Sequence, residues 1–336
     1  MLGTPRVLVA GGGLGGLTAA LALLRMGCDV EVYEQAPELK EVGAGLQLAA
    51  HGTRALYALG IGEELKALSC EAESKEIRIW NSGERWKLHD LGQVSIERYG
   101  YPYLTVYRPD LLGVLERAVR REKPDAIRLA AKCIGFEQTE ESVTVRLEDG
   151  KGVEADALIG ADGVHSRIRQ GLFGADRPEF TGVVAWRGIV PMDELPRHMV
   201  RMVGTNWVGP GGHVVHYPLR GGKVMNFVGA LERSDWRVES WSARGTQEEL
   251  RADFAGWHDD VHDRTWPAHC FDRCVGGFPT ADSAERSQCR GGRQIDAGEA
   301  RGLKASCHII LGKVFEFRRY VNSASAGNTS GGAAIF

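Results

Sequence analysis

The sequence predicts an α/β fold in which a parallel sheet carries an inserted, mixed β-sheet. An apolar run of strand length at residues 6–10 leads into a glycine-rich turn and then into an apolar pattern with a helical period. A second apolar strand, at 157–159, also ends in a glycine-containing turn. Alternating, strand-like stretches at 75–80, 214–217 and 224–228 predict the inserted sheet.

The first 35 residues follow the order strand, glycine turn, helix, strand, which is the context of a dinucleotide fingerprint. In that fingerprint Gly11 permits the tight turn, Gly13 lets the backbone approach a pyrophosphate, and Gly16 lets helix and strand pack closely. The alternative is that these glycines serve only a tight turn between strand and helix. The complete context favours a dinucleotide, and therefore a Rossmann-like domain.

Residues on either side of this turn add to the prediction. The helix expected over 14–26 starts with Leu14 and Gly15, and its N-terminus offers free N–H groups and a positive dipole end to phosphates. Glu34 ends the strand expected over 29–34, where an acid can accept hydrogen bonds from ribose hydroxyls. We therefore expect Leu14, Gly15 and Glu34 to contact the dinucleotide.

The turn that follows residues 157–159 contains Asp162 and Gly163. Asp162 can cap the next helix, and the glycine allows the chain to approach a ligand closely. Taken alone, an ordinary capped turn explains these residues as well as a ligand site does.

Composition excludes several classes of protein. The 336 residues include 41 basic and 44 acidic side chains, a net charge of −3 without a basic stripe, which argues against a nucleic-acid partner. No apolar run reaches the ~18–20 residues of a membrane span, and the start lacks a basic region with a cleavage site, so we expect a cytoplasmic protein without a membrane partner. Seven cysteines without CxxC pairs do not indicate a disulfide framework. No metal site is expected, because His258 and His262 have no identifiable third ligand.

Two strings carry a resemblance to known families. The spacing GxGxxG-x3-A-x6-G with the closing Glu34 resembles the FAD-binding start of glutathione-reductase-like flavoproteins. The string DALIGADGVHSRIR at 156–169 is similar to the DG motif of the single-component (class A) flavin-dependent aromatic hydroxylases, where it contacts the FAD pyrophosphate region. The resemblance implies that FAD is the dinucleotide and that Asp162 and Gly163 lie beside it.

Further blocks occur in the order of that family. Residues 107–111 look like its R-x-D-L segment, whose arginine, here Arg108, reaches the FAD. Residues 211–222 resemble the ring-facing strand of 3-hydroxybenzoate 6-hydroxylases and salicylate 1-hydroxylases. Residues 41–48 look like its GAGxQ segment along the flavin, which implies cofactor contacts for Gly45, Leu46 and Gln47.

The resemblance also implies a reaction and the residues that serve it. NADH or NADPH reduces FAD, the reduced flavin reacts with O2, and the resulting flavin C4a-hydroperoxide hydroxylates a phenolic acid of the hydroxybenzoate or salicylate type. His213 is the expected base for the phenol, because histidine titrates near neutral pH. Tyr217 points to the same face of the strand and is expected to hydrogen-bond the substrate carboxylate or hydroxyl, whereas His216 points away. Arg187 fits either a ligand of the substrate carboxylate or a surface ion pair.

Domain organisation follows from the positions of these blocks. We expect a discontinuous, incomplete FAD-binding domain at 1–74 and 104–176, and a substrate-binding sheet domain at 75–103 and 177–262. Residues 263–336 form an aberrant, poorly structured tail in this prediction, because Leu, Ile, Val and Met number 68 in residues 1–262 and 9 in residues 263–336. The tail also lacks the G-D-A-A-H-like segment that meets the FAD ribityl chain in the family.

Three interpretations of the function remain open. The first is an FAD-dependent hydroxylase of a phenolic acid. The second is an FAD oxidoreductase that does not hydroxylate, such as a dehydrogenase or reductase. The third is a catalytically inactive, truncated or frameshifted fragment of the hydroxylase. The sequence also leaves the oligomeric state open and is compatible with a homodimer.

Overall fold

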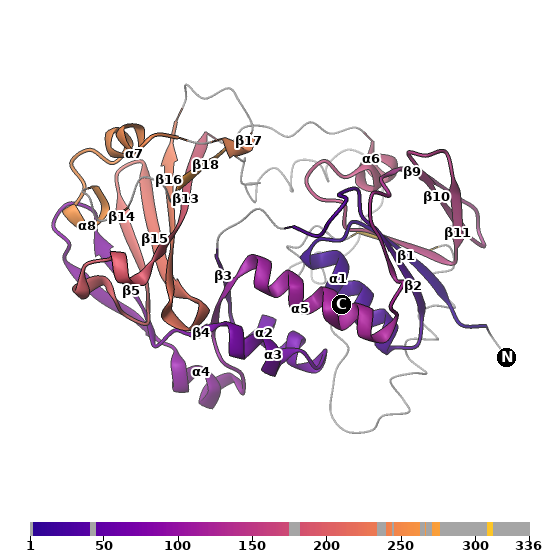
Figure 1. Cartoon of the computed structure of the whole chain (residues 1–336), viewed down its shortest axis with the longest axis horizontal. Helices are drawn as coiled ribbons and strands as arrows, with labels where there is room; N and C mark the ends of the chain where they lie inside the picture. Colours follow the sequence, from indigo (N-terminus) through magenta and orange to yellow (C-terminus); the bar gives the residue numbers. More distant parts are fainter. Residues whose placement is uncertain are drawn as a thin grey trace, which may run out of the picture. The chain divides into compact units, whose positions relative to one another are not determined.

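The computed structural model describes residues 3–40, 45–174, 182–233, 240–243, 245–262, 266, 271–275 and 308–311. These residues divide into two units (Figure 1). The first contains the described residues of 1–41, 112–177 and 296–336, and the second contains those of 42–111 and 178–295.

A five-stranded sheet forms the centre of the first unit. Its strand order is β19-β12-β1-β2-β8, with parallel pairing between β12, β1, β2 and β8 and an antiparallel edge strand, β19. The bounds are β1 (Arg6–Ala10), β2 (Asp29–Tyr33), β8 (Ile127–Arg128), β12 (Ala157–Gly160) and β19 (His308–Leu311). The strands predicted at 6–10, 29–34 and 157–159 are therefore confirmed, and they lie side by side in a parallel sheet.

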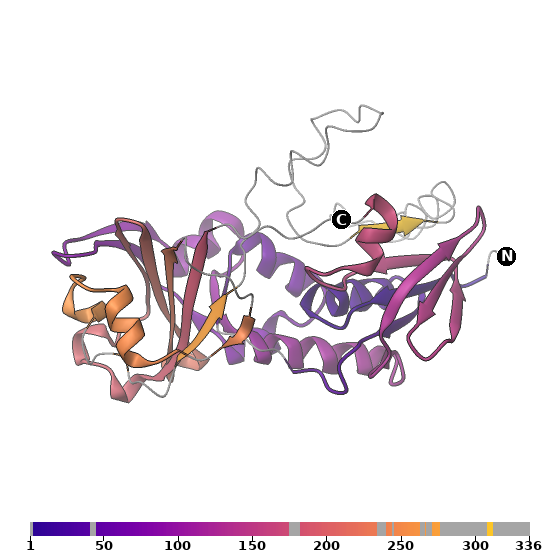
Figure 2. The same cartoon turned by 90° about the horizontal axis from the view of Figure 1, so that it is seen from above.

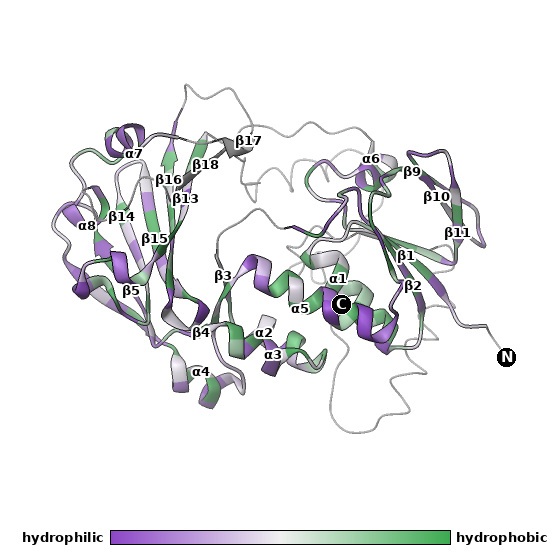
Figure 3. Ribbon diagram, in the orientation of Figure 1, coloured by the Kyte–Doolittle hydropathy of each residue, from purple (hydrophilic) through white to green (hydrophobic). Residues whose placement is uncertain are grey.

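Three helices accompany this sheet: α1 (Leu14–Arg25), α5 (Arg108–Glu122), which belongs to this unit from residue 112 onward, and α6 (Arg167–Phe173). Helix α1 ends where predicted, because Gly27 adopts a left-handed φ of 85°. Figure 3 shows α5 alternating between hydrophobic and hydrophilic residues. At its C-terminal end Ala118 and Val119 are buried while Arg117 and Arg121 are exposed, as expected for the solvated end of an amphipathic helix.

A small antiparallel sheet completes the first unit. It consists of β9 (Cys133–Gln138), β10 (Val143–Leu147) and β11 (Gly152–Ala155), in the order β11-β10-β9. Val143 and Val145 from β10 share one hydrophobic core with Leu8, Leu158 and Ile168. This core fixes the parallel sheet, and with it the turns at its strand ends.

An eight-stranded mixed sheet dominates the second unit, in the order β17-β18-β13-β16-β15-β14-β5-β6. Its strands are antiparallel except for the parallel pair β14 and β5. The bounds are β5 (Ser74–Ile79), β6 (Arg85–Asp90), β13 (Val183–Pro191), β14 (Val203–Gly209), β15 (Gly212–Leu219), β16 (Val224–Glu232), β17 (Ser240–Ala243) and β18 (Phe271–Val275). The predicted insertion of a mixed β-sheet into an α/β protein is confirmed.

One face of this sheet forms a large aromatic core. Trp186, Trp207 and Phe227 are fully buried there and pack with Phe254 and with residues of helices α7 (Gln247–Asp253) and α8 (Asp259–His262). Figures 1 and 2 show α7 and α8 on the same side of the sheet. The side chains at alternate positions of the same strands therefore lie on the opposite face of the sheet.

Shorter elements complete the second unit. A three-stranded sheet has the order β3-β7-β4, with β3 (Gly45–Leu48), β4 (Cys70–Glu71) and β7 (Leu104–Tyr107). The helices are α2 (Ala50–Ala58), α3 (Gly62–Leu68) and α4 (Gly92–Tyr99), and the 3-10 turns are η1 (Met192–Glu194), η2 (Arg197–Met199) and η3 (Arg220–Gly222).

Most of the tail at 263–336 lies outside the described residues, apart from Trp266, β18 and β19. The prediction that this tail is poorly structured, and the domain boundaries drawn from sequence motifs, stay predictions. Among the helices of the described residues, none is long and apolar enough to cross a membrane.

Candidate functional site

The glycine turn after β1 is packed too tightly for side chains at two of its positions. Gly11 has a φ of +103°, and a Cβ there would lie 2.3 Å from the carbonyl oxygen of Ala161. A Cβ on Gly16 would lie 1.9 Å from the carbonyl oxygen of Gly11. Both glycines are therefore required by the contact between the turn, α1 and β12, as the fingerprint predicts.

Gly13 is different, because a Cβ at this position would meet no described atom within 4 Å. Gly13 is also the N-cap of α1, no side chain caps that helix, and its first turn contains no acid. The backbone N–H groups at the start of α1, which begins with Leu14 and Gly15, thus suit an anionic group approaching over Gly13.

A cavity of about 490 Å³ lies beside this turn, entirely within the first unit. Its wall includes Gly11 and Gly13, the end of β2 with Glu34, and the 161–163 turn. It also includes residues that sequence reasoning missed: Lys132, Cys133, His165, Arg167 and Gln170. His165 and Arg167 belong to the DG-like string and could have been noticed there, whereas no pattern marked Lys132. The glycine turn and the uncapped start of α1 together fit the pyrophosphate of a dinucleotide.

Glu34 ties the glycine turn to the end of β2. Its Oε2 accepts a hydrogen bond from the Gly12 N–H at 2.6 Å, and its Oε1 accepts one from the Ala36 N–H at 2.8 Å. Each carboxylate oxygen can accept a second hydrogen bond, and Glu34 lines the cavity. Its structural role is thus established, and its contact with a ribose stays a prediction.

The N-cap of helix α6 is Ser166, whose hydroxyl oxygen accepts a hydrogen bond from the Arg169 N–H at 2.9 Å. Asp162 also binds the start of this helix, as the sequence predicts. Its Oδ2 accepts from the backbone N–H groups of Arg167 at 2.7 Å and Ile168 at 3.2 Å, and its Oδ1 accepts from the Ser166 hydroxyl at 2.5 Å. Gly163, next in the turn, has a φ of +82° and open space at its Cβ position. The capping explains the shape of the turn, while direct contact of these two residues with FAD stays a prediction.

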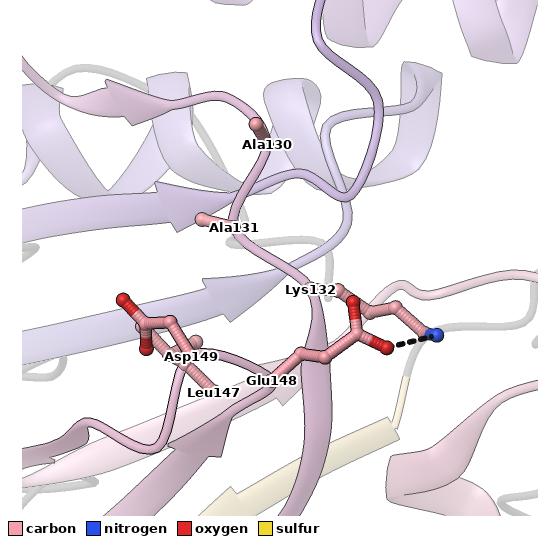
Figure 4. A pocket seen from close by; sticks show the side chains of 6 residues that line it. All are labelled: Ala130, Ala131, Lys132, Leu147, Glu148 and Asp149. Carbon is pink, nitrogen blue, oxygen red and sulfur yellow. Dashed lines mark hydrogen bonds and ion pairs between the residues drawn. The ribbon is translucent and has the colours of Figure 1, made fainter.

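A second cavity of the same unit, of about 300 Å³, is lined by three charged residues and three apolar ones (Figure 4). The Lys132 Nζ lies 2.7 Å from the Glu148 Oε1. The Asp149 Oδ2 lies 2.7 Å from the Nζ of Lys151. The charged side chains of this cavity therefore already form ion pairs within the chain.

In the second unit, strand pairing places His213 and Tyr217 on one face of the eight-stranded sheet. His213 pairs with Ala230, and Tyr217 pairs with Asn226 on the neighbouring strand β16. Side chains alternate along a strand, so positions 213 and 217 share the face opposite the aromatic core. Arg187 of β13 is opposite Val228 of β16, which puts it on this same face.

His216 points into the core, as predicted. It is buried, and its Nε2 accepts a hydrogen bond from the indole N–H of Trp207 at 3.1 Å. Burial lowers the pKa of His216 to about 3, so this imidazole is neutral at any physiological pH. His213, in contrast, is exposed. Partial desolvation of its ring lowers its pKa from the ordinary value of 6.5.

Tyr217 is packed against Gly45 of β3. A Cβ on Gly45 would lie 2.5 Å from the Cε2 of Tyr217 and 2.9 Å from its hydroxyl oxygen. The Gly45 N–H donates a hydrogen bond of 2.8 Å to the Oδ1 of Asn226, which is fully buried. Gly45 is therefore held between two residues of the sheet face. The preceding residues of the GAGxQ-like segment, 41–44, lie outside the described residues.

Gln47 contacts a second tyrosine of this region, Tyr103. The Tyr103 hydroxyl donates a hydrogen bond of 2.6 Å to the Gln47 Oε1. Burial raises the pKa of Tyr103 to about 12 and also raises the pKa of Tyr217. Both phenols therefore stay protonated at neutral pH and can donate hydrogen bonds. Tyr103 is a site residue that sequence reasoning missed. Leu46, between Gly45 and Gln47, pairs with Val106 of β7.

The R-x-D-L-like segment opens helix α5, with Arg108 as its first residue. Asp110 accepts two hydrogen bonds from Arg220, at 2.7 Å to Nε and 2.6 Å to Nη2. The same guanidinium lies 4.4 Å from the centre of the Tyr107 ring. This bidentate pair joins α5 to the end of β15. Whether Arg108 reaches FAD stays a prediction.

Together, the fold and the two sites define a dinucleotide-binding α/β protein whose large β-sheet carries His213, Tyr217 and Arg187 on one face. The model of the FAD binding domain family matches residues 4–271. The chain is 39% identical over 283 residues to 3-amino-4-hydroxybenzoate 2-monooxygenase of Streptomyces platensis, which covers 82% of this chain and 70% of the relative. It is 39% identical over 252 residues to 3-hydroxybenzoate 6-hydroxylase of Polaromonas naphthalenivorans, and this match covers 74% of this chain and 62% of that relative. The crystal structure of Klebsiella pneumoniae HpxO complexed with FAD and uric acid matches with a TM-score of 0.68 at 27% identity. The match covers 82% of this chain and 69% of that chain.

This chain belongs to the FAD binding domain family of FAD-dependent aromatic monooxygenases. The resemblance inferred from the sequence motifs is thereby confirmed, and FAD is the cofactor of the family. The relatives' names differ in the ring that they hydroxylate, so the family alone does not fix the substrate.

Proposed function

We propose that this chain hydroxylates a phenolic aromatic acid of the hydroxybenzoate or salicylate type, with NADH or NADPH as reductant and O2 as oxidant. The observation that carries the proposal is the placement of His213, Tyr217 and Arg187 on one face of the eight-stranded sheet, opposite its aromatic core. Two relatives whose names specify hydroxybenzoates support the substrate class. We also infer that the protein is cytoplasmic.

The chain's own residues would bind and orient the reactants. Bound FAD supplies electron transfer from the nicotinamide and the chemistry with O2. The glycine turn and the start of α1 would hold its pyrophosphate. Tyr217 stays protonated and would donate a hydrogen bond to the substrate carboxylate or hydroxyl. Arg187 supplies positive charge on the same face.

His213 would take the proton of the phenol, because hydroxylation by an electrophilic oxygen is faster on a phenolate. A base must be neutral to accept a proton, and the lowered pKa of His213 keeps it neutral over a wider range of pH. Its exposure leaves a route for that proton to solvent.

This role predicts a particular pH profile. As pH falls through the lowered pKa of His213, kcat/KM should decrease, with an apparent pKa below 6.5. His213→Asn should lower kcat/KM by roughly a hundredfold and remove this acidic limb. His89→Asn, at an exposed position on β6, is the matched control and should keep the limb. An unchanged limb in His213→Asn would show that another group is the base.

The experiment that tests the proposed function compares product with NADH and NADPH consumption. The purified, FAD-loaded chain is given 3-hydroxybenzoate, salicylate or 3-amino-4-hydroxybenzoate, and the ring product is quantified by mass spectrometry. Hydroxylated product equal to the nicotinamide consumed supports the proposal. Nicotinamide consumption with peroxide only would favour an oxidoreductase that does not hydroxylate. Failure to bind flavin would identify the chain as an inactive fragment.

A further inference from the structure

Lys75 of β5 is a half-buried cation that has no acidic partner among the described residues. Its Nζ lies 5.5 Å from the centre of the Tyr103 ring, and no carboxylate of the described part of the chain comes within ion-pair distance. Desolvation lowers the pKa of Lys75, with no compensating charge nearby. A partly buried ammonium without an anion is unfavourable, so an anionic ligand would stabilise it.

The register of the sheet places Lys75 in the same row as Tyr217. Lys75 pairs with Gly204 of β14, and the pairing of Thr205 with His216 puts Gly204 level with Tyr217. With neighbouring strands ~4.8 Å apart, the backbones of Lys75 and Tyr217 are roughly 10 Å apart. Between them Gly204 contributes no side chain, so both side chains can reach toward one small ligand.

Polar side chains lie around both residues. The ammonium of Lys75 lies 5.5 Å from the centre of the Tyr103 ring, and the Tyr103 hydroxyl donates a hydrogen bond to Gln47. Next to Tyr217, the Nδ2 of fully buried Asn226 has no hydrogen-bond partner among the described residues. The row of Lys75, Gly204, Tyr217 and Asn226 thus holds one cation and several hydrogen-bond donors, and none of these side chains is acidic.

Arg187, the cation that the sequence motifs suggested for the carboxylate, differs from Lys75 in one respect. Arg187 already has an interaction partner, whereas among the described residues Lys75 contacts only the ring of Tyr103. Charge-assisted hydrogen bonds are among the strongest that a carboxylate accepts, and Lys75 donates none to the described part of the chain.

We propose that Lys75 is the residue that binds the carboxylate of the aromatic acid, and that it selects acids over uncharged phenols. This inference rests on the proposed function. The ring would lie along Tyr103 and Tyr217, with the carboxylate at the Lys75 end of the row. Lys75 is thus a specificity-determining residue contributed by β5, a strand outside the motifs of the family.

The test compares an acid with its uncharged amide in two variants. Affinities of 3-hydroxybenzoate and 3-hydroxybenzamide are measured by calorimetry on FAD-loaded protein, and KM and kcat are measured in parallel. Lys75→Met should weaken binding of the acid by roughly 10–100-fold, leave binding of the amide unchanged and raise KM more than it lowers kcat. Lys75→Arg should restore most of the preference for the acid. Lys87→Met, on the exposed strand β6, is the matched control and should keep it.

Two results would overturn the inference. Lys75→Met could bind the acid as tightly as the parent protein, or it could lose acid and amide affinity equally, which indicates a structural role. If Lys75→Met does not fold, Lys75→Gln gives the same comparison. Failure of the proposed function looks different, because the parent protein would then hydroxylate neither compound.

Discussion

Gly13→Ala is expected to weaken FAD binding by at least about tenfold while leaving the stability of the flavin-free protein unchanged. A Cβ at this position meets no described protein atom within 4 Å, and the φ of −72° suits alanine. The only penalty should therefore arise when a pyrophosphate approaches the turn. FAD affinity is measured by titration of the flavin-free protein, and stability by its urea unfolding.

Gly16→Ala provides the contrasting control. Its Cβ would lie 1.9 Å from the carbonyl oxygen of Gly11, so the turn and α1 must move apart even without a ligand. The free energy of unfolding of the flavin-free protein should fall by about 3 kcal/mol. If Gly13→Ala binds FAD as the parent protein does, the cofactor does not approach the turn at Gly13.

Gly45→Ala should lower both stability and activity, and it should act through Tyr217. The new Cβ would lie 2.5 Å from the Cε2 of Tyr217, so either the phenol or β3 must shift. We expect the free energy of unfolding to fall by about 1–3 kcal/mol, as in overpacked cores. We also expect kcat/KM for the phenolic acid to fall by up to roughly a hundredfold, because a displaced positioning group misaligns the substrate.

A double variant tests that route. Tyr217→Ala removes the ring that the new Cβ would meet. In that background Gly45→Ala should cost little further stability or activity, so the two substitutions should be strongly non-additive. Additive losses would show that Gly45 acts independently of Tyr217, for example through the hydrogen bond from its N–H to Asn226.

The parts of the fold that could be predicted from the sequence are those encoded locally. The unit from β1 to β2 could be predicted because strand, turn and helix signals follow one another within 35 residues, and Gly11 and Gly16 each have a specific steric reason. The contact of Asp162 with the start of α6 could also be predicted, because its acceptors and donors are at most six residues apart. The strand-like alternation of residues predicted β5, β15 and β16, and the predicted ends differ from the observed ends by a few residues.

Contacts between distant segments could not be predicted from one sequence. The hydrogen bond from Gly45 to Asn226 spans 181 residues, and the pair Arg220–Asp110 spans 110. None of these four residue types is unusual for its position, and only the packing of distant elements brings the partners together. Lys75 was missed because a lysine in an alternating strand normally indicates a solvated face. Only the pairing of β5 with β14 brings it into the row of Tyr217.

The measurement that most directly tests whether this chain is a hydroxylase follows the oxygen atom. FAD-loaded protein is incubated with NADH or NADPH, 3-hydroxybenzoate or salicylate, and isotopically labelled dioxygen, and the product is analysed by mass spectrometry. We expect one labelled oxygen atom in the ring product for each nicotinamide oxidised. Oxidation of nicotinamide with all label in peroxide, or no oxidation by flavin-loaded protein, would contradict the assignment.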